Sequence, residues 1–324
     1  MRAAVMMRYG GPEVVEVRQL PKPMPKKREV LVAVHTSAVG RSDCGRRSAR
    51  PRLLARWLYG PLRPGRTILG MEFAGEVEAV GKGVTQFTPG DRVFGMVRYR
   101  ETGANADYVC VSEDGYIATI PEGLPFEQAV LCEGAFYARP CVERFNLKPG
   151  DKLLIYGASG AIGTAALQLA KAAGVHVTAV VDTRHLELVK SLGAERAIDY
   201  TKEDFTRIGE TFDGVLDAVG KTTYLRCRRL LKPAAMFVGT DMGPYGQTGL
   251  LTLWRALTGR GRVTVPIPKR DPAFVKFLKA RMEAGELRAV IDRHYPLEAI
   301  ADAHRYVDTG QKTGIVIIDV RASP

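Results

Sequence analysis

The sequence predicts an α/β fold with two parts, a β-rich domain and a doubly wound parallel sheet. The chain has 324 residues, which is more than one ordinary hydrophobic core accommodates. The first ~120 residues contain short alternating segments separated by Gly and Pro. From about residue 125, strands alternate with longer helical segments. We therefore expect one domain of residues 1–124 and 267–324, with a second domain of residues 125–266 inserted into it.

The β-rich domain is predicted from several short strands. Residues 30–35 form an apolar run, residues 75–81 alternate, and residues 91–95 follow a Pro-Gly turn. Such strands suggest a small barrel-like domain. After residue 266 the pattern predicts an amphipathic helix over 271–284 and strands over 287–291 and 314–320. These last elements are expected to rejoin the β-rich domain.

The second part begins with the most informative stretch of the chain. A buried strand at 152–155 leads into a glycine turn, a helix at 164–174, and a strand at 175–181 that ends in Asp182. This order is typical of a dinucleotide-binding unit, because glycines let the backbone approach a pyrophosphate and the helix N-terminus supplies free N–H groups. The residues expected to contact the coenzyme in the turn are Gly157, Ala158, Ser159, Gly160, Ala161, Ile162 and Gly163.

Two later strands, at 212–217 and 236–240, should end at the same edge of the sheet. We expect Val219 to line the adenosine end of the coenzyme. Gly239 and Thr240 are expected at its nicotinamide end.

Composition limits the class of protein. Hydrophobic residues make up 46% of the chain and charged residues 25%, as in soluble globular proteins. No apolar run approaches the ~20 residues of a membrane span, and the N-terminus does not resemble a signal peptide. Five scattered cysteines favour a reducing, cytoplasmic compartment.

The net charge of +12 comes in part from arginines clustered at 46–66 and 226–229. A basic balance can indicate nucleic acid or an anionic surface, but also a solvated surface or attraction of an anionic coenzyme. Because the 46–66 segment also carries apolar residues, we interpret it as a short helix or lid over a cleft.

At this point the sequence resembles a known family. Residues 68–75, 90–94, 191–194 and 198–200, together with the glycine turn, are similar to the medium-chain dehydrogenase/reductase superfamily. The similarity is strongest to its zinc-independent quinone oxidoreductase-like branch. The resemblance implies a GroES-like catalytic domain, a Rossmann coenzyme domain and a homodimer. It also implies NAD(P)H-dependent hydride transfer to a small hydrophobic quinone or α,β-unsaturated carbonyl.

The departures from zinc-dependent members are informative. Those members place Cys where this chain has Gly40 and His where it has Met71, while the third ligand position matches Cys132. Glu72 matches an acid next to the metal. Since catalytic zinc needs at least three protein ligands, we expect no metal and interpret Cys132 as a buried thiol.

Without a metal, hydride would add to an already electrophilic carbon, and the protein would orient the substrate and supply a proton. Ser42 could donate to a substrate oxygen or ribose, and Arg41 could stabilise an enolate. Asp43 could act in the chemistry or hold Arg41 or a backbone amide. Tyr59 or Tyr137 could donate a proton or a hydrogen bond, or simply pack.

The choice of coenzyme rests on opposing signals. Asp182 favours NADH, because a carboxylate accepts hydrogen bonds from the ribose diol and repels a 2′-phosphate. Arg184 and His185 follow directly, beside Thr183, and could neutralise that phosphate. Tyr200 lies where relatives contact it. We lean slightly towards NADH on the position of Asp182.

Two other functions stay open. One is a zinc-free alcohol or carbonyl dehydrogenase of a biosynthetic pathway. The other is a non-catalytic coenzyme- or RNA-binding protein of the crystallin type, which the basic charge would suit. RNA binding of that kind would weaken steeply as salt rises. We do not expect nucleic acid as a partner, since the sequence shows no aromatic-rich RNA-binding strand motif.

Overall fold

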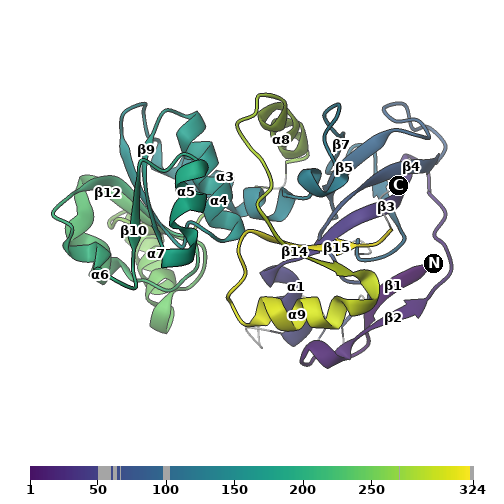
Figure 1. The fold of residues 1–324 in the computed structure, drawn as a ribbon, viewed down its shortest axis with the longest axis horizontal. Helices are drawn as coiled ribbons and strands as arrows, with labels where there is room; N and C mark the ends of the chain where they lie inside the picture. Colours follow the sequence, from purple (N-terminus) through teal and green to yellow (C-terminus); the bar gives the residue numbers. More distant parts are fainter. Residues whose placement is uncertain (50–59, 61–63, 66, 98–102, 270, 322–324) are drawn as a thin grey trace. The chain divides into compact units, whose positions relative to one another are not determined.

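The computed structural model describes residues 1–49, 60, 64–65, 67–97, 103–269 and 271–321. Two compact units are formed, Met1–Glu133 with Asp271–Pro324, and Gly134–Arg270. Both units are drawn in Figure 1. Within the described ranges, no helix has the length and apolar character needed to cross a membrane.

The first unit is built on a seven-stranded sheet in the order β14-β15-β3-β4-β5-β7, with β6 also paired to β3. The long strand β3 is almost wholly buried and joins the two halves of this sheet. Beside it lies the two-stranded sheet β1-β2. The strands are β1 (Arg2–Met6), β2 (Val15–Gln19), β3 (Glu29–Val39), β4 (Glu72–Val80), β5 (Arg92–Met96), β6 (Tyr108–Ser112), β7 (Ile117–Thr119), β14 (Ile291–Pro296) and β15 (Ile315–Asp319).

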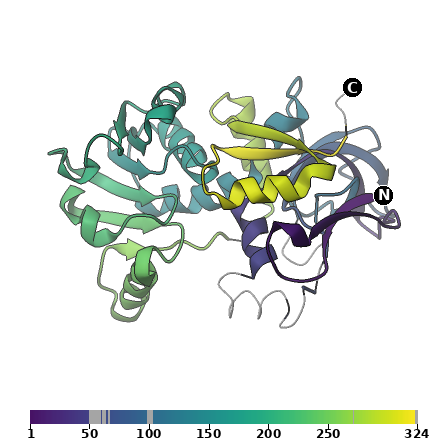
Figure 2. The same cartoon turned by 60° about the horizontal axis from the view of Figure 1, so that its bottom comes forward.

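Helix α9 closes the core of this unit. Its buried side packs against β2, β14 and β15, and in Figure 2 it is the yellow helix across the yellow strands. Ile300, Ala303 and Val307 contribute to an apolar cluster of the first unit, which removes their surface from water. The helices among the described residues of this unit are η1 (Pro12–Val14), α1 (Arg41–Ser48), η2 (Phe126–Ala129), α8 (Ala273–Glu283), η7 (Leu297–Ala299) and α9 (Ile300–Asp308).

The strand predicted over 287–291 is wrong. Strand β14 begins only at Ile291, and residues 287–290 form no regular element. Leu287, Ala289 and Val290 are nevertheless buried. Their apolar character reflects packing against the core rather than pairing in the sheet.

The second unit contains a six-stranded sheet in the order β10-β9-β8-β11-β12-β13, with every pairing parallel. The chain order reverses between β8 and β11, which is where doubly wound sheets bind dinucleotides. The predicted doubly wound parallel sheet is therefore confirmed. The strands are β8 (Lys152–Tyr156), β9 (His176–Val181), β10 (Arg196–Asp199), β11 (Phe212–Asp217), β12 (Leu231–Gly239) and β13 (Val263–Thr264).

Helices connect these strands. They are α3 (Cys132–Phe145), which begins in the first unit, α4 (Ala161–Ala172), η3 (Thr183–His185), α5 (Leu186–Ser191), η4 (Phe205–Arg207), α6 (Tyr224–Cys227), η5 (Arg228–Leu230), η6 (Pro244–Gly246) and α7 (Gln247–Thr258). Helix α4 is buried from Gly163 to Ala170, as its small and apolar residues allow.

Candidate functional site

The glycine turn joins β8 to α4 in a conformation that only glycine satisfies. Gly157 has φ +78°, and a Cβ there would lie 2.6 Å from the Val219 side chain. A Cβ on Gly163 would lie 2.2 Å from the Gly157 carbonyl oxygen. Both positions therefore exclude a side chain, because it would force the helix away from the turn.

Gly160 differs from the other two. It is the N-cap of α4 and provides no side-chain cap, and the nearest heavy atom to its Cβ position is 3.8 Å away. The first amides of a helix have no acceptor within the helix and carry partial positive charge. The open space beside Gly160 thus fits a pyrophosphate that accepts hydrogen bonds from these amides.

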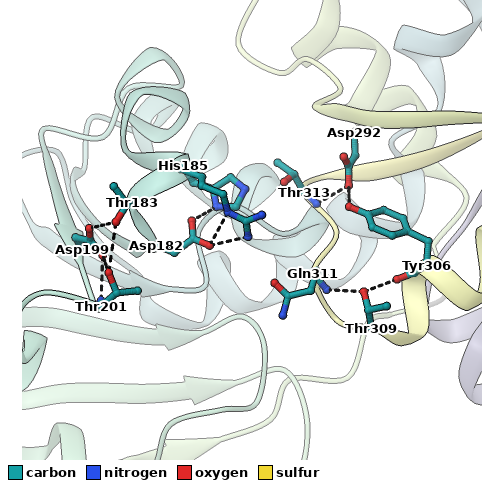
Figure 3. A network of polar contacts seen from close by, with 11 residues as sticks. Asp182, Thr183, His185, Asp199, Thr201, Asp292, Tyr306, Thr309, Gln311 and Thr313 are labelled. Atoms are coloured by element: carbon teal, nitrogen blue, oxygen red, sulfur yellow. Dashed lines mark hydrogen bonds and ion pairs between the residues drawn. The ribbon is translucent and has the colours of Figure 1, made fainter.

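The acid that ends β9 contacts two basic side chains, one of which, His185, is labelled in Figure 3. Asp182 Oδ2 accepts a hydrogen bond from Arg184 Nη2 at 2.9 Å, and Oδ1 contacts His185 Nδ1. Burial alone would raise the pKa of Asp182, but the Arg184 hydrogen bond and the His185 charge outweigh it and lower the pKa. Asp182 is therefore an ionised carboxylate that is already partly neutralised.

A second carboxylate lies at the end of β10. Thr183 and Thr201 both donate their hydroxyls to Asp199, and the Thr201 N–H also donates to it at 3.0 Å. These hydrogen bonds, from Thr183 first, lower the pKa of Asp199 to about 2. Thr183 is thus oriented by Asp199, while Tyr200 beside it is 47% exposed and available to a ligand.

The end of β11 carries a residue that the sequence did not single out. Asp217 is buried, and its carboxylate accepts hydrogen bonds from the N–H groups of Val219, Gly220 and Thr222 at 3.1, 2.8 and 2.9 Å. The Thr240 N–H donates to the Asp217 carbonyl at 3.1 Å. Asp217 therefore fixes both the Val219 turn and the end of β12. The signal that could have identified Asp217 in the sequence is its place as an acidic residue at the end of a predicted strand.

In the first unit, the start of α1 is capped from outside the helix. Gly40 is the N-cap and has no side chain of its own to offer. A Cβ there would lie 1.7 Å from Glu133 Oε2, and the Ser42 N–H donates to Glu133 Oε1 at 3.3 Å. The carboxylate of Glu133 thus fills the space that a residue larger than glycine would need, and accepts from the helix terminus.

Two further carboxylates lie behind Glu133. Asp43 accepts hydrogen bonds from the N–H groups of Gly40 and Gly70 at 3.0 and 3.1 Å, and Glu72 Oε2 accepts from the Glu133 N–H at 3.0 Å. Burial, and then the charge of Glu133, raises the pKa of Asp43 to about 7 and that of Glu72 to about 8. Asp43 and Glu72 therefore retain protons near neutral pH.

The other predicted residues have varied surroundings. Arg41 is exposed and Ser42 half-buried, both in the first turn of α1. Tyr137 is half-buried on α3, and the centroid of its ring lies 5.6 Å from that of the Phe136 ring. Tyr59 lies outside the described residues. Cys132 is buried, and burial raises its pKa far above the usual value of a thiol.

In the described part of the chain, no group of three or more His, Cys, Asp or Glu residues is arranged to hold a metal ion. Gly40 and Met71, at two of the positions that correspond to zinc ligands, offer neither imidazole nor thiolate.

Comparisons with known proteins agree with this fold. Residues 26–122 match the alcohol dehydrogenase GroES-like domain, and residues 192–318 match the zinc-binding dehydrogenase family. The chain is 31% identical to a quinone oxidoreductase of Pseudomonas aeruginosa, over 96% of this chain and 97% of the relative. It is 30% identical to an NADPH-dependent alkenal/one oxidoreductase of Arabidopsis thaliana, over 98% of this chain and 79% of the relative.

A solved structure leads to the same class. The quinone oxidoreductase from Coxiella burnetii has a TM-score of 0.86 and 29% identity, over 99% of both chains. The chain therefore belongs to the medium-chain dehydrogenase/reductase superfamily, in its quinone oxidoreductase-like branch. It is an oxidoreductase with a GroES-like and a Rossmann-like domain, and the family resemblance is confirmed.

Proposed function

We propose that this oxidoreductase transfers hydride from NAD(P)H to a quinone or an α,β-unsaturated carbonyl without zinc. The arrangement at Gly40 carries the proposal, because the carboxylate of Glu133 occupies the space of a ligand side chain. Met71 offers only a weakly binding thioether at the second position. With no metal to polarise a simple ketone, an acceptor that is already electrophilic is favoured.

The names of the relatives support this substrate class. The Pseudomonas protein is a quinone oxidoreductase and the Arabidopsis protein an alkenal/one oxidoreductase. Both names describe acceptors that take a hydride at an electron-poor carbon. A small hydrophobic quinone or enone is accordingly the substrate that we propose.

We propose that the glycine turn, from Gly157 to Gly163, holds the coenzyme pyrophosphate. The Asp182 carboxylate would accept from the ribose diol, and its ionised state favours NADH. Its hydrogen bond from Arg184 supports NADPH as the alternative, because the guanidinium could turn to a 2′-phosphate. Thr183, His185, Tyr200, Val219, Gly239 and Thr240 are proposed to complete the coenzyme site.

Roles for the residues of α1 follow from their contacts. Asp43 is proposed as a positioning residue, since both of its oxygens accept backbone hydrogen bonds. Ser42 and Arg41 are proposed to stabilise negative charge on the substrate oxygen. Tyr59 and Tyr137 stay proposed donors of a hydrogen bond or proton.

A homodimer is proposed as the working state. Leu250, Leu253, Trp254 and Leu257 on α7 are all more than half exposed, next to the edge strand β13. Such a patch is costly in water, and a second copy would cover it. Sedimentation velocity tests this, and a monomer at micromolar concentration would contradict it.

The function is tested by coenzyme oxidation with chelator-treated protein. NADH and NADPH are each compared against a simple benzoquinone and a conjugated enone, with residual metal measured in the same sample. We expect turnover that chelation leaves unchanged and a preference for NADH. Loss of turnover on chelation that zinc restores would refute the metal-free reaction. Coenzyme binding without turnover would favour the biosynthetic dehydrogenase or the non-catalytic alternative.

A further inference from the structure

Helix α7 presents an apolar stripe to solvent. Four of its residues are 56% to 76% exposed and stand at positions i, i+3, i+4 and i+7 of the helix: Leu250, Leu253, Trp254 and Leu257. This spacing places the four side chains on one face of the helix. A surface helix normally turns such a face towards its own core. The stripe on α7, which is labelled in Figure 1, therefore suits a partner outside the chain.

Two further exposed apolar residues border this stripe. Met242 is 60% exposed, and its side chain lies over the first turn of α7, where a Cβ on Gly249 would meet Met242 Cε. Leu225 is 55% exposed, and its N–H donates to the Gln247 side chain at the start of α7 at 3.4 Å. The exposed apolar surface is therefore wider than one helix face.

The charge of this region is strongly one-sided. Between Asp217 and Asp271 the chain has ten Lys or Arg residues and one acid, Asp241, so this segment carries +9 of the net charge of +12. Six of the ten basic residues are exposed: Lys221, Arg226, Arg228, Arg229, Arg260 and Lys269. Arg226 pairs with Asp204 outside the segment. A surface with so few acids attracts anions.

One of these basic residues is held beside the stripe. The Arg260 N–H donates to the Thr258 hydroxyl at 3.1 Å, and that hydroxyl donates to the Trp254 carbonyl oxygen at 2.7 Å. The Cβ position of Gly261 lies 3.8 Å from Trp254 Cδ1, so the loop of residues 259–261 packs against the last turn of α7. An exposed arginine thus borders an exposed indole ring.

We propose that α7 and the 259–261 loop bind the anionic surface of a lipid bilayer, where the bilayer replaces the second copy proposed to cover the stripe in solution. Helices that lie in a membrane interface combine a face of Leu and Trp with surrounding Lys and Arg. Anionic lipids accept the apolar side chains and neutralise the basic residues. A second copy would cover the stripe but bring another +9 towards it. RNA would neutralise the charge but leave the leucines in water.

Membrane binding also bears on the substrate. Hydrophobic quinones dissolve in the bilayer, so the bound enzyme would meet them there, a consequence that rests on the proposed function. Binding to vesicles needs no turnover. Failure of the proposed function would therefore leave the binding result unchanged, and the two are tested separately.

The test is cosedimentation of the full-length protein with vesicles of phosphatidylcholine alone and with about one-third phosphatidylglycerol. Wild-type protein should bind only the anionic vesicles, and added salt should weaken this binding. Arg260→Gln should lower the partition coefficient about fivefold, the effect of one basic residue at an anionic surface. Trp254→Gln should lower it about tenfold or more, since one large apolar side chain no longer enters the interface.

Two matched variants control for these changes. Arg207→Gln removes an arginine of the same unit whose side chain is 85% exposed, and Met24→Gln removes an 81% exposed apolar residue of the first unit. Both controls should bind vesicles as the wild type does. All four residues are exposed, so the variants should fold, which circular dichroism checks.

Several results would overturn the proposal. One is a wild type that does not bind anionic vesicles at low salt, or binds neutral vesicles equally well. Another is vesicle binding that neither Trp254→Gln nor Arg260→Gln lowers. If Trp254→Gln loses the dimer in sedimentation velocity but keeps wild-type vesicle binding, the stripe serves the second copy alone. Tighter binding of polyuridylic acid than of vesicles, unchanged in Trp254→Gln, would assign the basic surface to nucleic acid instead.

Discussion

Two glycines of the coenzyme turn should respond differently to the same change. Gly160→Ala places a methyl group where the nearest heavy atom is 3.8 Å away, at a backbone φ of −78° that alanine adopts freely. Gly163→Ala places it 2.2 Å from the Gly157 carbonyl oxygen and 2.7 Å from Ala158 Cα. Both of these contacts are backbone atoms, so the helix itself would have to move.

The magnitudes follow from these distances. For Gly160→Ala, the loss of unfolded-chain entropy stabilises by about 0.4–1 kcal/mol and the weaker N-cap offsets this, so stability should change by less than about 1 kcal/mol. The methyl group instead blocks the approach of a pyrophosphate. Loss of one hydrogen bond to a charged group costs about 1.5–3 kcal/mol, or roughly 10- to 100-fold in coenzyme Kd. For Gly163→Ala, overpacking should cost about 1–3 kcal/mol of stability as well.

Urea unfolding without coenzyme and titration of NADH fluorescence measure the two quantities independently. Gly160→Ala should change only binding, whereas Gly163→Ala should change both. If Gly160→Ala bound coenzyme as the wild type does, the pyrophosphate would not lie at this helix terminus. If both variants lost equal stability, the space beside Gly160 would not be open.

Three other perturbations have defined outcomes. Asp182→Ser removes a carboxylate that repels a 2′-phosphate, so the ratio of kcat/KM for NADPH to kcat/KM for NADH should rise about tenfold. Steady-state kinetics with each coenzyme measures this ratio. An unchanged ratio would show that Asp182 does not face the ribose. Burial first, and then charge repulsion, raises the pKa of Glu72 to about 8 and of Asp43 to about 7. The stability contributed by these protonated carboxyls is fully present below ~pH 4 and is lost as pH rises through 7 and 8. Urea unfolding at pH 5 to 8.5 should therefore show a free energy of unfolding that falls with pH. In Glu72→Gln this fall should be smaller. Asp308→Ala should lower the free energy of unfolding by about 3 kcal/mol, because Arg47 is 1% exposed and would keep a buried charge without its ion pair. A loss below ~1 kcal/mol in the same assay would contradict this reasoning.

Local patterns correctly predicted the strand, glycine turn, helix and strand that begin the parallel sheet. The strand, glycine turn and helix are adjacent in sequence, so hydrophobic period and glycine spacing suffice to place β8, α4 and β9. The prediction of a strand over 287–291 was wrong because it, too, used only the local pattern. A short apolar run has the same pattern whether its residues pair in a sheet or pack as a loop, and only the tertiary structure decides between them.

The candidate site in the first unit was beyond local patterns. Glu133 reaches Gly40 across 93 positions of the chain. Their proximity depends on the pairing of β3 with β4, because Gly40 follows β3 and the Glu133 N–H donates to Glu72 of β4. Sequence comparison could show that Gly40 and Met71 depart from zinc ligands, but not which side chain fills the space.

Gly40 and Glu133 are best understood as one feature. A cysteine at position 40 would meet Glu133 Oε2, and because that carboxylate ends a flexible side chain it could swing aside. Doing so would take the acceptor away from the Ser42 N–H and leave the start of α1 without its cap. The glycine therefore makes room for the acid, and the acid stabilises the helix that the glycine leaves uncapped. Because each residue compensates for the other, a metal ligand cannot be restored at position 40 alone without cost to α1.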